Sequence, residues 1–254
     1  MISPSLIRFV ITAAIRDRLI IALFLLLVMA ISMSIFMGSA AITEQDQFLA
    51  VFSAGTIRVI NVIGLILFIV FFIRRSFETR DIEFLLSRPL SRIQLIVSFA
   101  AGFSIIAAVL GLVSGICVTA LSPHLYSDGH ILWTLSLMVE NIIMVNAALF
   151  FSMILSSAAS GAFAVCGFYV LGRMMSQILG IIDSNKMTSA LEPLEIIMQV
   201  ISAIMPRLDL MAQTSWLVYD VGQQISYGFV VAQGALYVSL LLLAALIDMQ
   251  RRKF

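Results

Sequence analysis

The chain has 254 residues, of which 61% are hydrophobic and only 11% are charged. A water-soluble domain is about half apolar and about a quarter charged, so a soluble fold is excluded, because it could not bury this much apolar surface. The formal net charge of +1 gives no sign of a polyanionic partner, and we expect no nucleic-acid binding. The natural surrounding of such a chain is a lipid bilayer.

Cysteine and histidine are too few and too scattered to form a cofactor site. Cys117 and Cys166 lie inside apolar runs, and no CxxC pair is present. This excludes a disulfide framework and a thiolate metal site. His124 and His130 fall in one short predicted loop, where we interpret them as solvated side chains, since haem and zinc sites need more convergent ligands. We therefore predict no metal and no cofactor in this chain.

Residues 1–18 have the pattern of a helix that lies in the membrane interface. Apolar residues recur at three- and four-residue spacing from Leu6 to Ala14, with arginines at the edges. Ser3 and Pro4 fit the cap and the first helical residue. In the alternative interpretation, this segment simply extends the first membrane span.

Six apolar runs have the length of a membrane span, and each must be helical because lipid cannot satisfy an exposed peptide group. The first is too long for a cleaved signal sequence, so we expect it to be retained. The runs are Leu19–Met37, Phe52–Ile73, Leu95–Ala120, Ile131–Leu155, Ala158–Ile182 and Tyr227–Ile247.

Lysine and arginine gather on one side of these runs. They precede the first run, lie between the second and third, and follow the sixth, whereas the other side holds only Lys186 and Arg207. The positive-inside rule makes the first side cytoplasmic, with both termini there. We predict an all-α polytopic protein with a single transmembrane domain. Its parts are an interfacial helix (1–18), spans one and two (19–73), a cytoplasmic segment (74–94), spans three to five (95–182), an extracytoplasmic segment (183–226), and span six with a basic tail (227–254).

The extracytoplasmic segment is expected to contain amphipathic helices. An apolar stripe runs from Ile196 to Met205 and stops at Pro206, which is too short to cross a bilayer. It can lie on the membrane surface or dip partly into the protein. Trp216 and Tyr219 fit an interfacial aromatic pair.

The cytoplasmic segment predicts a short amphipathic helix followed by a sharp stop. Its acidic residues lie toward the start, where they favour the helix dipole. Arg88 and Pro89 end it, and the Ser91–Gln94 stretch matches a capping box for the next span. Such a helix can fill a groove on a partner protein, or it can rest on lipid headgroups. The residues that we expect at this site are Glu78, Asp81, Ile82, Glu83, Leu85, Leu86, Ser87, Arg88, Pro89 and Arg92.

The run from Phe77 to Arg92 resembles the coupling-helix region of type-2 permeases of ATP-binding-cassette exporters. Leu85–Pro89 and the Ser91-Arg92 pair match that pattern, whereas the stretch Thr79–Asp81 replaces the Ser-Gly-Thr of many relatives. The layout of the whole chain is also similar to this family. The stretch Pro206–Asp209 resembles an outer loop of its copper-enzyme-maturation branch.

This resemblance implies a permease subunit that works with a separate ATPase, which carries the ATP and Mg²⁺, and with a second copy of itself or a homologous permease. It also implies export and a bacterial inner membrane. No GxxxxGK[ST] phosphate loop occurs in the chain, so we expect no ATPase or other enzyme activity in it. The alternatives are a non-transporting scaffold of a membrane complex and a secondary transporter. The latter is less favoured, because no run contains a proline and no inverted repeat is evident.

Two opposite charges lie deep within neighbouring runs. Glu140 and Arg173 each lie about nine residues, or about 13–14 Å, from the outer end of their run. An unpaired charge at that depth costs about 3 kcal/mol, so we predict that they form an ion pair facing the bundle interior. The pair acts either as a structural clamp, which we favour, or as a polar patch that contacts substrate. Asn141 and Asn146 are expected to add hydrogen bonds between helices.

Overall fold

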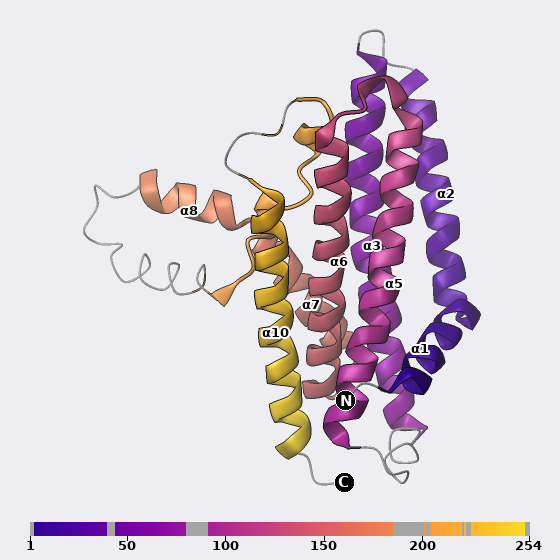
Figure 1. Ribbon diagram of the computed structural model, residues 1–254, viewed down its shortest axis with the longest axis vertical. Helices are drawn as coiled ribbons and strands as arrows, with labels where there is room; N and C mark the ends of the chain where they lie inside the picture. The colour runs from indigo at the N-terminus through magenta and orange to yellow at the C-terminus, as the bar shows by residue number, and fades with distance from the viewer. Residues whose placement is uncertain are drawn as a thin grey trace.

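The computed structural model describes residues 3–39, 44–79, 91–184, 201, 204–219, 221 and 225–251, and all regular structure in this part of the chain is helical. Five of the described helices are long and apolar enough to cross a bilayer, as expected of a multi-pass membrane protein. They pack side by side as a bundle (Figure 1). These helices are α2 (Arg18–Ser39), α3 (Gln45–Glu78), α5 (Arg92–Leu121), α6 (Asp128–Ile154) and α10 (Tyr227–Arg251).

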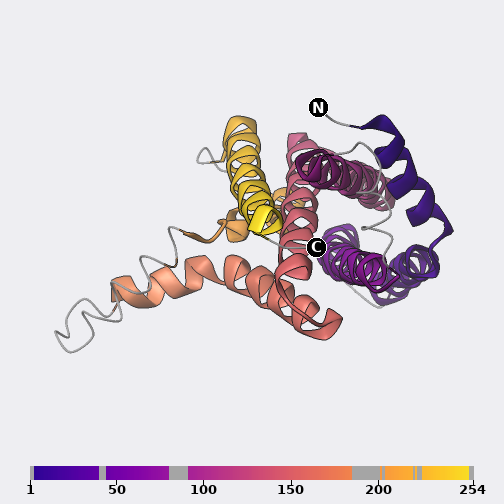
Figure 2. The same cartoon turned by 90° about the horizontal axis from the view of Figure 1, so that it is seen from below.

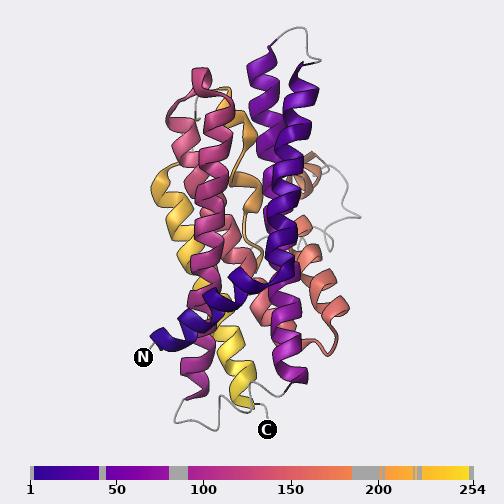
Figure 3. The same cartoon turned by 90° about the vertical axis from the view of Figure 1, so that its right-hand side faces the viewer.

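The first helix, α1 (Pro4–Arg16), is separate from α2 and crosses the base of the bundle (Figure 3). The chain bends between them at Asp17, whose backbone is extended. One face of α1, formed by Leu6, Val10 and Ala14, is buried. The absence of a side chain at Gly102 lets Val10 approach α5 closely. This geometry excludes the alternative in which the segment lengthens the first span.

The start of α1, the end of α3, the start of α5 and the end of α10 lie at one end of the bundle, called here the basal end (Figures 1 and 2). At 34 residues, α3 is about 51 Å long and extends beyond the thickness of a bilayer core. Glu78 is its last residue, so the expected coupling helix does not begin there. The predicted cap of α5 is present, since Ser91 Oγ accepts a hydrogen bond from the Gln94 amide at 3.1 Å.

The fifth apolar run is not one helix, and the predicted span Ala158–Ile182 is wrong. Helix α7 (Ala158–Arg173) has 16 residues and is about 24 Å long, too short for a perpendicular crossing. The chain bends at Met174, and α8 (Met175–Ser184) leaves the bundle sideways (Figure 1). Most of the predicted apolar stripe 196–205 lies outside the described residues.

Beyond the end of α7, residues 205–217 run along the remaining length of the bundle, and they are called here the irregular segment. It contains two short 3-10 turns, η3 (Leu208–Leu210) and η4 (Thr214–Leu217). Ala212 contacts Ser136 of α6, and Trp216 contacts Gly129 at the start of α6. The irregular segment therefore runs antiparallel to α6, from the end of α7 toward the end of the bundle opposite the basal end. It lies within the bundle, although the sequence predicted an outer loop here.

Close helix packing depends on glycine at the interface of α5 and α6. A Cβ atom added at Gly115 would lie 2.3 Å from Thr134 Oγ1 and 2.8 Å from Thr134 Cβ, and one at Gly111 would lie 3.0 Å from the Met138 backbone. Small residues let membrane helices approach in this way. Gly111 and Gly115 form the GxxxG pattern of this run.

We predict that Gly115→Ala lowers the free energy of unfolding by about 1–3 kcal/mol, because the added methyl group forces α5 away from α6. Denaturation in detergent, followed by circular dichroism, measures this loss. Gly167→Ala is the matched control, since nothing lies within 4 Å of its added Cβ. Equal effects of the two substitutions would contradict the close approach.

Candidate functional site

Most of the predicted coupling site lies outside the described residues, namely Asp81, Ile82, Glu83, Leu85, Leu86, Ser87, Arg88 and Pro89. The two flanking residues are described. Glu78 is exposed at the end of α3. Arg92, the first residue of α5, donates a hydrogen bond from Nη1 to the Met249 carbonyl of α10 at 3.3 Å.

The helices that flank this site are packed firmly together. Ile73 near the end of α3 and Leu95 near the start of α5 are each only 1–2% exposed and belong to one apolar cluster. Met153 of α6 and Met249 of α10 join the same cluster. Arg74 also donates from Nη2 to the Leu155 carbonyl at the end of α6. Residues 79–91 are therefore held between two helix ends that cannot shift independently of the bundle.

The structure brings Glu140 and Arg173 together, with Arg173 Nη1 at 3.7 Å from Glu140 Oε2. The Glu140 side chain is completely buried, and the Arg173 side chain is 19% exposed. Arg58 of α3 and Tyr169 of α7 also interact with Glu140 electrostatically. One buried carboxylate is thus surrounded by two cations and a phenol.

Both cations also hold the backbone of the irregular segment. Arg173 Nη1 donates to the carbonyls of Leu208 and Met211, the second at 2.7 Å. Arg58 Nη1 donates to the Ala212 carbonyl at 2.7 Å. Arg58 lies within the second apolar run, where the sequence would favour an interfacial side chain, but its bond to Ala212 shows that this is wrong. The two guanidinium groups supply the donors that a helix would have supplied from its own backbone.

Side chains from two further helices complete this support. Ser136 Oγ of α6 accepts a hydrogen bond from the Ala212 amide at 2.8 Å. The Tyr237 hydroxyl of α10 donates to the Met205 carbonyl at 2.8 Å. The irregular segment is consequently bound to four helices of the bundle, α3, α6, α7 and α10.

Ala212 carries backbone strain at the centre of these contacts. Its φ of 44° is in the left-handed region, which costs a residue with a Cβ about 1 kcal/mol or more. Its amide bonds Ser136 and its carbonyl bonds Arg58, so both backbone groups are fixed by side chains of other helices. Strain of this kind persists only where the surroundings determine the conformation.

The other intramembrane polar residues have mixed outcomes. Asn146 Nδ2 donates to Ser104 Oγ of α5 at 3.1 Å, which confirms the expected bond between helices. The Asn141 side chain is buried without a hydrogen-bond partner among the described residues. Asn61, which the sequence analysis did not single out, bonds Ser114 of α5 at 2.7 Å.

Two predicted environments are wrong. His130 lies in α6 rather than in a loop, and it is only 2% exposed. Trp216 is 4% exposed within the bundle and is therefore not an interfacial anchor, whereas Tyr219 is 70% exposed. His130 lies in the first turn of α6, and Trp216 lies in the irregular segment. The sequence predicted open loops at both places.

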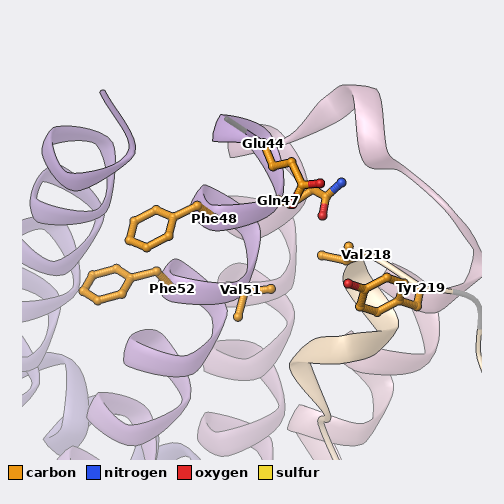
Figure 4. Close-up of a pocket in the computed structure, with 7 residues that line it drawn as sticks. All are labelled: Glu44, Gln47, Phe48, Val51, Phe52, Val218 and Tyr219. Carbon is orange, nitrogen blue, oxygen red and sulfur yellow. The ribbon is translucent and has the colours of Figure 1, made fainter. Parts of the chain in front are cut away.

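An open pocket of about 400 Å³ lies where the irregular segment leaves the bundle (Figure 4). Val218 and Tyr219 face the first turns of α3, which contribute Glu44 and Gln47. Phe48 and Phe52 stack with ring centroids 5.6 Å apart on the same helix. Glu44 is the only charged residue among the described lining residues, and these offer few groups that could orient a ligand.

These features define a helical, multi-pass membrane protein in which two arginines, a serine and a tyrosine hold a non-helical piece of backbone inside the bundle. Arg58 and Arg173 each bind carbonyl oxygens of this segment, as a structural clamp would, whereas Arg58 Nε and both Glu140 oxygens have no hydrogen-bond partner among the described residues. A scan against protein-family models and a search of curated proteins both return no match for this chain.

We predict that Arg173→Met lowers the free energy of unfolding by about 3–5 kcal/mol, because it leaves the Glu140 carboxylate buried and unpaired. Glu140→Gln should cost less, about 1–2 kcal/mol, since Arg173 keeps its carbonyl partners. The double variant should lose less than the sum of the two. Unfolding in detergent measures all three, with Arg251→Met at an exposed position as the control. Additive losses would contradict the pair.

We also predict that a cysteine at Met211 is protected and that one at Tyr219 reacts with a thiol reagent that cannot cross the membrane. Met211 is fully buried, whereas Tyr219 is 70% exposed. Cys117 and Cys166 are first replaced by serine, so that each variant has a single thiol. Mass spectrometry of the labelled protein measures the modification. Rapid labelling at both positions would mean that residues 205–217 form an exposed loop.

Proposed function

We propose that this chain is the permease subunit of an ATP-binding-cassette exporter of the type-2 class, located in a bacterial cytoplasmic membrane with both termini in the cytoplasm. A separate ATPase binds ATP and Mg²⁺, and a second copy of the chain or a homologous permease completes the transporter. The proposal starts from the resemblance of Phe77–Arg92 to the coupling-helix region of that class.

The observation that carries the proposal is the firm attachment of both ends of this region. A coupling segment transmits force only if the helices on either side move with it. Here α3 continues without a break to Glu78, and α5 starts at a capped Arg92 that also bonds α10. A push on the end of α3 or the start of α5 would therefore reach the apolar cluster of α3, α5, α6 and α10 directly.

The distribution of charge supports a cytoplasmic basal end. Arginines line the helix ends there, and the opposite ends of α3 and α6 begin with acidic residues, Asp46 and Asp128. The positive-inside rule orients such a bundle with its arginine-rich end in the cytoplasm. The arginines of the basal end are Arg8, Arg16, Arg18, Arg74, Arg75, Arg92 and Arg251.

One structural feature favours a secondary transporter as the second candidate. Discontinuous helices at charged intramembrane residues are typical of that class, and the crossing of α7 is discontinuous beside Glu140 and Arg173. Both guanidinium groups of this site already bind protein carbonyls, however, and Arg173 also pairs with Glu140, the carboxylate that a coupling cation would need. This difference makes the permease the preferred proposal.

We predict that the tagged chain, extracted from its own membrane in mild detergent, purifies with an ATPase that contains a phosphate loop. In the reconstituted complex, Glu83→Ala or Arg88→Ala should reduce ATP-driven transport by about ten-fold or more, because the coupling segment loses its fixed position on the ATPase. ATP hydrolysis should continue, and the unfolding temperature should not change.

Asp46→Ala is the matched control, since Asp46 lies at the opposite end of α3 and should leave coupling intact. Transport that needs only an ion gradient, in vesicles that contain no ATPase, would establish the secondary transporter instead. Stable association with an ATPase but no transport of any cargo would favour the scaffold.

A further inference from the structure

A cavity of about 690 Å³ lies at the basal end, in the corner between α1, α2 and α3. Three arginines line it, from three different helices: Arg16 ends α1, Arg18 begins α2, and Arg75 lies in the last turn of α3. The bend at Asp17 brings the first two together.

The positive charge of this cavity is only partly neutralised by the residues that the structure describes. Within the part of the chain that the structure describes, none of the three guanidinium groups makes an ion pair or a side-chain hydrogen bond. Asp17 is the only acidic residue among the described lining residues, and its Oδ1 accepts a hydrogen bond from the Leu19 amide at 2.7 Å. The cavity therefore offers unpaired donors that suit a phosphate group.

The other part of the lining is apolar and continues onto the lipid-facing surface. Phe9, Phe71 and Leu19 line the cavity and are 45%, 48% and 37% exposed, respectively. From Leu19 onward, α2 presents large exposed side chains such as Phe24 and Leu25 along its length. A ligand with a phosphate and a hydrocarbon chain would match both parts, whereas a small soluble anion would use only the arginines.

We propose that this corner is a binding site for an anionic phospholipid. The phosphate lies among Arg16, Arg18 and Arg75, and an acyl chain follows the apolar face of α2. A basic pocket between membrane helices, at the level of the headgroups, is the geometry that recognises such lipids. The lipid would join α1 to α2 and α3. This site is independent of ATP coupling and does not rest on the proposed function.

The test uses the purified full-length chain in detergent and native mass spectrometry to count bound lipids. Dioleoyl phosphatidylglycerol and dioleoyl phosphatidylcholine are titrated separately, because they share acyl chains and differ in net charge. The wild type should retain phosphatidylglycerol preferentially. Removing an arginine, in Arg16→Gln or Arg75→Gln, should weaken phosphatidylglycerol binding about five-fold and leave phosphatidylcholine binding unchanged.

Arg8→Gln is the matched control, since Arg8 is exposed on α1, carries the same charge and does not line the cavity. Loss of binding equal to that of Arg16→Gln would mean a general surface attraction and would overturn the site. Displacement of the lipid by inorganic phosphate at similar concentration would also overturn it, because the apolar part would then contribute nothing.

A measurement on the wild type keeps the proposal testable if a variant fails to fold. Phosphatidylglycerol binding should weaken as salt is raised, since the site is open to solvent and its contacts are ionic. Phosphatidylcholine binding should not change. Phosphatidylglycerol binding that is insensitive to salt would contradict a phosphate held by the three arginines.

Discussion

Every peptide group inside a bilayer needs a hydrogen-bond partner, and this requirement explains the arrangement around residues 205–217. A helix satisfies the requirement by itself, but an irregular backbone must borrow donors and acceptors from its neighbours. Arg58, Arg173, Ser136 and Tyr237 lend them here, from four different helices. Glu140 offsets part of the charge of the two arginines. The two intramembrane arginines are therefore explained by the non-helical segment at residues 205–217, whose carbonyls they bind.

The two halves of the bundle are built differently. At the basal half, α3, α5, α6 and α10 share one continuous apolar cluster that includes Phe99 and Phe103. At the other half, a second cluster around Trp133 includes Ala212 and Trp216 of the irregular segment. Leu208 and Met211 belong to the basal cluster, so the segment joins the two. The first half is suited to transmitting a force from the basal end, and the second contains the strained element that such a force would reach.

Structural features that depend only on local sequence pattern were predicted correctly. The amphipathic α1, the cap at Ser91 and five long apolar helices follow from spacing and composition alone. The meeting of Glu140 and Arg173 was also predicted, from their equal depth below the outer ends of their runs. That depth was wrong for Arg173, because α7 ends there, but the two residues still meet since they lie at nearly the same distance from the tight turn at 155–157. The end of α7 was not predictable from proline or from a run of polar residues, since Met174 and the following residues are as apolar as a span. One signal in the sequence pointed to the irregular segment. Arg58 is a charge within the second apolar run, and such a charge needs hydrogen-bond acceptors from another part of the chain. The buried state of Trp216 and His130 depends on residues distant in sequence, which hydropathy cannot reveal.

The irregular segment also has a consequence for biogenesis. A helix can enter a membrane alone, but residues 205–217 would expose bare carbonyls to lipid until α3, α6 and α7 had assembled. Insertion must therefore be sequential: the helices come first, and the segment docks afterwards onto a preformed set of side chains. The last step of folding is thus the docking of this segment onto side chains that other helices already hold in place.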